Sequence, residues 1–99
     1  MSGQSGWREL RDRRMAEPGA VEEYVAARIA YELGKSVRQM REARAWSQSD
    51  LAREAGMTQS AVARFEAGGT IPTLPVVERL AHALGADVDV RLIPRAPAA

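Results

Sequence analysis

Residues 47–68 read SQSDLAREAGMTQSAVARFEAG, and they predict two short helices joined by a tight turn. The helices are expected over 48–55 and 59–67. Gly56 is predicted to end the first helix, because glycine readily adopts the positive φ found at a helix C-terminus. Two short helices held at a steep angle form a helix-turn-helix motif.

Polar residues that precede each helix are predicted N-caps. Ser47 and Thr58 each carry a hydroxyl that can accept from a first-turn amide. Asp50, three residues after Ser47, completes a capping box, in which Glu or Gln is the more usual residue. The caps indicate where both helices begin.

Small and apolar residues inside the motif predict how the helices pack. Ala52 is small where the two helices approach each other, and Val62 and Phe65 hold the second helix to the core. The exposed face of the second helix then carries short or bidentate-capable side chains: Gln59, Ser60, Ala63 and Arg64. Gln can read adenine, Arg can read guanine and Ser can read either, so we expect Gln59, Ser60 and Arg64 to contact bases in the major groove. The alternative is an ordinary solvated face.

Residues 35–85 resemble the Xre-type, phage-repressor-like helix-turn-helix family. The matching segments are Trp46-Ser47-Gln48, Leu51-Ala52, Gly56-Met57-Thr58-Gln59-Ser60, Val62, Phe65-Glu66, Gly68, Pro72-Thr73-Leu74 and Leu80-Ala81-His82-Ala83-Leu84-Gly85. The resemblance implies a mainly α, lambda-repressor-like helical domain that inserts the second helix of the motif into the major groove of DNA.

The resemblance also implies roles for residues around that helix. Gln48, at the start of the first motif helix, would face a DNA phosphate. Thr58 would cap the recognition helix and touch either the DNA backbone or a thymine methyl. Arg41 and Glu66 match positions that form a buried ion pair in some members. Arg38 is the preferred phosphate contact among the cations spaced three residues apart from Lys35 to Arg44, which otherwise form a solvated stripe.

The rest of the chain is predicted to be helical up to a short C-terminal strand. Helical periodicity from Pro18 to about Ala45 fits either one long helix or two helices bent near Gly34. The expected organisation is an N-terminal arm over 1–17, a helical domain over 18–86, a strand over 87–93 and a tail over 94–99.

Alternation of polar and apolar residues predicts the strand over 87–93. Its side chains Val88, Val90 and Leu92 would share one face. A lone strand in a helical domain has an unpaired edge, so we expect it to form an antiparallel ribbon with a second copy and create a homodimer. The alternative is pairing with an N-terminal segment of the same chain.

The N-terminal arm carries Trp7 and Leu10 at helical spacing, and we expect it to bind a protein partner; the alternatives are that it packs on the helical domain or extends the dimer. A short Xre-type domain with such an arm and a terminal strand is similar in layout to the HigA-type antitoxins. That similarity implies that the chain neutralises a toxin protein and represses its own operon.

Composition excludes several classes of function. The 99 residues include no cysteine and one histidine, which excludes disulfides, thiolate metal sites and thiol catalysis. No apolar run is long enough to cross a membrane, and no signal segment is recognisable, so a cytoplasmic location is expected. We find no catalytic constellation and expect a non-enzyme without metal or cofactor.

These observations predict a dimeric, sequence-specific transcriptional repressor that binds a near-palindromic operator in double-stranded DNA, and the similarity in layout implies that it is an antitoxin. The alternative is a protein-interaction module in which DNA binding is secondary.

Overall fold

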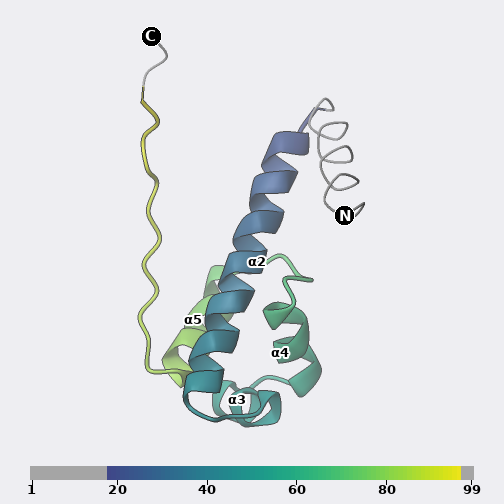
Figure 1. Ribbon diagram of the computed structural model, residues 1–99, viewed down its shortest axis with the longest axis vertical. Helices are drawn as coiled ribbons and strands as arrows, with labels where there is room; N and C mark the ends of the chain where they lie inside the picture. The colour runs from purple at the N-terminus through teal and green to yellow at the C-terminus, as the bar shows by residue number, and fades with distance from the viewer. Residues whose placement is uncertain (1–17, 97–99) are drawn as a thin grey trace, which may run out of the picture.

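The computed structural model describes residues 18–96, which form four α-helices. These helices are α2 (Ala20–Ala43), α3 (Gln48–Ala55), α4 (Gln59–Glu66) and α5 (Leu74–Ala83). The shorter helices gather around the C-terminal half of α2, while its N-terminal half projects beyond them (Figure 1). The described part of the chain is therefore mainly helical, as predicted.

α2 is one continuous helix of 24 residues, which decides between the two alternatives left open at Gly34. Gly34 is buried where α2 meets the C-terminal end of α4. A Cβ atom at this position would lie 2.4 Å from the carbonyl oxygen of Phe65. The glycine therefore serves a close approach of two helices rather than a bend. No described helix, α2 included, has the length and apolarity needed to cross a membrane.

Hydrogen bonds at the caps define the ends of α3 and α4. The Ser47 hydroxyl accepts from the Asp50 amide at 3.0 Å, and the Asp50 carboxylate accepts from the Ser47 amide at 2.8 Å. The Thr58 hydroxyl accepts from the amide of Ala61 at 3.1 Å. Gly56 ends α3 with a φ of 67°. The capping residues expected from the sequence thus form these caps.

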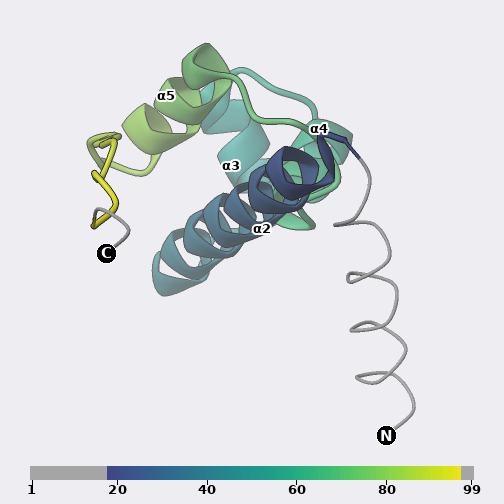
Figure 2. The ribbon, with the colours of Figure 1, turned by 90° about the horizontal axis from the view of Figure 1, so that it is seen from above.

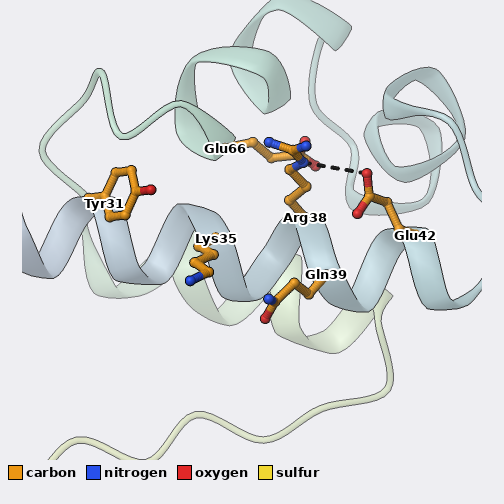
Figure 3. A pocket seen from close by; sticks show the side chains of 6 residues that line it. All are labelled: Tyr31, Lys35, Arg38, Gln39, Glu42 and Glu66. Atoms are coloured by element: carbon orange, nitrogen blue, oxygen red, sulfur yellow. Dashed lines mark hydrogen bonds and ion pairs between the residues drawn. The ribbon is translucent and has the colours of Figure 1, made fainter. Parts of the chain in front are cut away.

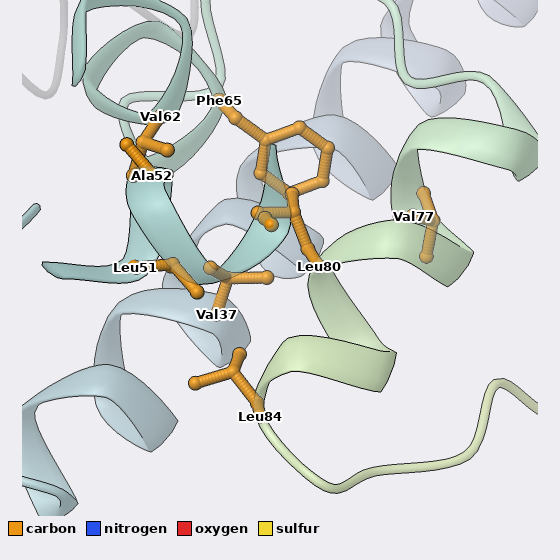
Figure 4. Packing of buried hydrophobic residues seen from close by; sticks show 9 residues of the cluster. Val37, Leu51, Ala52, Val62, Phe65, Val77, Leu80 and Leu84 are labelled. Carbon is orange, nitrogen blue, oxygen red and sulfur yellow. The ribbon is translucent and has the colours of Figure 1, made fainter. Parts of the chain in front are cut away.

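The core lies between α3, α4 and α5, with α2 closing one side. α3 packs against both α4 and α5, and α2 packs against α4 (Figure 2). Leu51, Val62 and Leu80 are fully buried at the centre, and Phe65 packs beside them (Figure 4). Leu74 lies in the first turn of α5, and its side chain is 66% exposed.

The strand predicted over 87–93 is not formed. Among residues 18–96, the backbone hydrogen bond furthest along the chain joins the Ala86 amide to the Ala81 carbonyl, and residues 86–96 are extended without a ladder partner. Val88 packs partly against the core, whereas Val90 and Leu92 are 68% and 96% exposed. A strand requires inter-strand hydrogen bonds, and no other described segment of this chain is extended beside it to provide them.

Candidate nucleic-acid interface

The exposed face of α4 carries the residues predicted to read bases. Gln59, Ser60 and Arg64 are all exposed, while Val62 and Phe65 on the opposite face enter the core. Arg64 makes no hydrogen bond or ion pair within residues 18–96, so its guanidinium is available. The short helix thus separates anchoring side chains from polar ones that can reach a ligand.

A chain of side-chain hydrogen bonds links the start of α4 to the start of α3. The Gln59 Nε2 donates to the Gln48 Oε1 at 2.8 Å, and the Gln48 Nε2 donates to the Glu66 Oε1 at 3.1 Å. An amide group has two donor hydrogens and an acceptor oxygen. Gln59 therefore keeps one N–H and its oxygen, which is the pair that bidentate recognition of adenine requires. The bond to Gln48 limits the orientations of this amide.

Glu66 anchors that chain through an ion pair with Arg41. The Arg41 Nε lies 2.7 Å from one carboxylate oxygen and its Nη2 lies 3.0 Å from the other. The two side chains are 12% and 3% exposed. The Arg41 Nη1 also donates to the Trp46 carbonyl at 2.7 Å. The hydrogen bonds with Glu66 raise the pKa of Arg41 above its usual value, against the opposing effect of burial. Arg41 is therefore occupied within the fold.

The N-terminus of α3 already holds a carboxylate. The Asp50 side chain accepts from the Ser47 amide and pairs with Arg53 at 3.0 Å. These contacts, the Ser47 backbone bond foremost, hold the pKa of Asp50 below its usual range. The capping box occupies the amides of Ser47 and Asp50, so a phosphate at this end would depend on Gln48 rather than on those groups.

Arg38 lies on α2 near Glu66, the last residue of α4, whereas Gln59 is the first residue of that helix. The Arg38 side chain is 62% exposed, and its Nε is 3.4 Å from the Glu42 carboxylate. Arg38, other side chains of α2 and Glu66 of α4 line an open hollow of about 250 Å³ (Figure 3). The structure therefore brings Gln48 and Gln59 together but leaves Arg38 near the C-terminal end of α4.

A comparison with known protein families identifies the family of this chain. A family model described as a helix-turn-helix domain matches residues 32–92, more than half of the chain. The chain belongs to the helix-turn-helix domain family. No curated protein and no solved structure matches it.

The matched region leaves part of the structure unassigned. The helix-turn-helix match begins at Glu32, so the projecting N-terminal half of α2 precedes it. The match extends to Leu92 and so includes most of the extended segment after α5. Trp7 and Leu10, predicted to bind a partner, lie outside the described residues.

Arg44 has a structural role that sequence reasoning missed. Its Nη2 donates to the Leu84 carbonyl at 3.0 Å, and its guanidinium lies 4.9 Å from the centre of the Trp46 ring. The carbonyl belongs to the C-terminal end of α5, which a cation stabilises. Arg44 thereby joins α2 to α5 across the helix-turn-helix domain. Regular spacing along α2 gave no signal that distinguishes Arg44 from Arg38.

Asp50→Asn is expected to remove a pH-dependent contribution to stability. Because the pKa of Asp50 is lowered by folding, its contribution is complete above the unfolded-state pKa, about 3.9, and disappears as the pH falls through the folded-state value. Urea unfolding from pH 7 to pH 2 should show that the wild type has the larger free energy of unfolding at neutral pH and that the difference disappears in acid. Ser49→Ala, which alters a neutral residue in the same turn, should show a pH-independent difference. A difference in the free energy of unfolding between wild type and Asp50→Asn that stays the same from pH 7 to pH 2 would contradict this role.

Proposed function

We propose that this protein is a sequence-specific transcriptional repressor that reads the major groove with α4. The observation that carries the proposal is the oriented amide of Gln59, bonded to Gln48 and flanked by Ser60 and the available cation of Arg64. Membership of the helix-turn-helix family supports DNA as the ligand. The proposed function is binding and assigns no catalytic residue.

Few phosphate contacts are expected beside the base contacts. The connector 69–73 has the sequence GTIPT and carries no charge, and Arg41 and Arg44 are held within the fold. The proposed backbone contacts are Gln48, Thr58 and Arg38. Because the salt dependence of affinity reflects the number of phosphates neutralised, a shallow slope is expected.

The decisive experiment measures fluorescence anisotropy with DNA from upstream of the gene and with scrambled DNA, at several salt concentrations. Gln59→Ala and Arg64→Ala should each weaken specific binding by roughly tenfold, because a bidentate base contact contributes about 1–3 kcal/mol of discrimination. Arg79→Ala removes an exposed cation from α5 and should leave specific binding unchanged. Equal affinity for both DNAs, unaffected by Gln59→Ala, would refute the proposal.

A dimer is part of the proposed function. One recognition helix covers a half-site, and two copies on a near-palindromic operator would place two such helices about 34 Å apart. We propose that the extended segment 87–93 mediates pairing, since Val90 and Leu92 are exposed on it and have no partner in the described chain. The stoichiometry of the DNA titration, two chains per operator, tests this part.

The projecting half of α2 favours a second candidate function, neutralisation of a toxin protein. That half of α2 and the arm before it precede the family match, which begins at Glu32, so DNA recognition does not account for them. The two functions should separate by location. Gln59→Ala with Arg64→Ala should abolish DNA binding and spare partner binding, and Trp7→Ala with Leu10→Ala should do the reverse. Loss of both functions in either folded double variant would contradict separate surfaces.

A further inference from the structure

An apolar stripe on the projecting half of α2 has no cover among the described residues. Val21, Val25 and Ile29 recur every four residues and are 50%, 37% and 46% exposed. Residues four apart lie on one face of a helix, so the three side chains form a continuous row. From Val21 to Ile29 the row is eight residues long, or about 12 Å. The core contacts of α2 lie further along the helix, at Val37.

We propose that residues 7–15 of the same chain pack on this stripe as an antiparallel helix and form a helical hairpin with α2. Seventeen residues precede Pro18 and join α2 at the end where the stripe begins. A helix over 7–15 spans about 12 Å, the same length as the stripe. The inference concerns a face outside the DNA-reading surface and does not depend on it.

The turn before α2 suits a reversal of the chain. Gly19 adopts a left-handed conformation with a φ of 78°, and Pro18 precedes it. Proline disfavours helical geometry at the residue that precedes it, which here is Glu17. A helix over 7–15 would therefore end before Pro18. The connection of four residues, 16–19, is within the range that joins antiparallel helices.

The side-chain pattern is matched on the two sides of that turn. Counting equal distances from Pro18 places Met15 opposite Val21 and Trp7 opposite Ile29. The same register places Arg14 opposite Glu22, which lies about 100° around the helix from Val21 and so pairs opposite charges beside the apolar row. Arg11 falls opposite Val25, so the apolar contacts of this register lie at the two ends of the stripe, with the charged pair beside one of them.

The short connection between residues 7–15 and α2 favours these residues, rather than a second copy of the chain, as the segment that covers the stripe. A short connection keeps the arm at an effective concentration in the millimolar range, above ordinary protein concentrations. A helix as short as 7–15 is marginal in water unless an apolar face is packed. The stripe and the arm can therefore cover each other without a partner.

Introduced cysteines test the proposal, because the full chain has none. In the counted register, residue 8 is opposite residue 28, so the pair Arg8→Cys with Arg28→Cys should form a disulfide within one chain. The bond requires Cα atoms within about 7 Å of each other. The control pair, Arg8→Cys with Lys35→Cys, moves the second thiol seven residues, about 10 Å, along nearly the same face of α2. We expect intramolecular oxidation at least about tenfold faster in the first pair.

Ile29→Glu, added to the first pair, should slow oxidation to the control rate, while Leu74→Glu, at an exposed position of α5, should not. Circular dichroism confirms that each variant remains folded. Equal rates in the two cysteine pairs would indicate an arm without this register and overturn the proposal. Disulfides between chains, with a rate that rises with protein concentration, would assign the stripe to a second copy instead. Absence of oxidation in the first pair would also overturn it.

Discussion

Glu66→Ala is expected to destabilise the protein by about 3–5 kcal/mol, the typical cost of removing one partner from a buried ion pair. The substitution leaves the guanidinium of Arg41, whose side chain is 12% exposed, without its carboxylate. It also removes the acceptor of the Gln48 Nε2. Urea unfolding followed by circular dichroism measures the loss.

Two further variants separate the causes of this effect. Glu42→Ala removes an exposed carboxylate that pairs with Arg38, and should cost no more than about 1 kcal/mol. Replacement of both partners, Arg41→Met with Glu66→Leu, should restore most of the stability, because apolar residues need no charge compensation. Under the proposed function, the double variant should still bind DNA more weakly, since Gln48 loses the bond that orients it. A Glu66→Ala variant as stable as Glu42→Ala would contradict the buried pair.

Gly34→Ala is expected to lower the free energy of unfolding by about 2 kcal/mol. Alanine favours a helix over glycine by about 1 kcal/mol, but overpacking costs up to about 3 kcal/mol. The added Cβ would lie 2.4 Å from the Phe65 oxygen and 2.8 Å from the Glu66 oxygen. Both are backbone atoms that cannot rotate away, so α2 and α4 must separate and the collision outweighs the gain in propensity.

Two alanine substitutions serve as controls for Gly34→Ala in thermal and urea unfolding. Ser36→Ala, at an exposed position of α2, should change stability by only a few tenths of a kcal/mol. Gly56→Ala should cost about 1 kcal/mol, because its φ of 67° strains a side chain although the space around it is open. Gly34→Ala should therefore be the most damaging of the three. A stabilised Gly34→Ala variant would mean that the two helices do not meet at this glycine.

The helices and their caps were predictable because local interactions determine them. Ser47, Asp50 and Thr58 bond to amides within three residues, and α3 has the predicted bounds Gln48–Ala55. Apolar residues of the second helix likewise identified Val62 and Phe65 as core residues. Such features depend on neighbours in sequence, so periodicity and residue type reveal them.

Tertiary contacts decided what the individual side chains do. Arg38, Arg41 and Arg44 recur every third residue in the sequence and look equivalent there. In the structure, Arg38 pairs loosely at the surface, Arg41 is buried against Glu66, and Arg44 binds the end of α5. Their partners come from four to forty residues away, and residue spacing does not specify which partner each arginine meets.

The sequence by itself determined a helix-turn-helix motif, its caps and the polar face of the second helix, because these follow from short-range hydrogen bonds and helical periodicity. The tertiary structure alone decided that Gly34 is a contact point, that Gln48 orients Gln59, and that 87–93 forms no strand within the described chain. The physical reason is that close packing and strand pairing depend on which distant groups meet. A side-chain pattern can show that a segment is able to pair, whereas only the fold provides or withholds the partner.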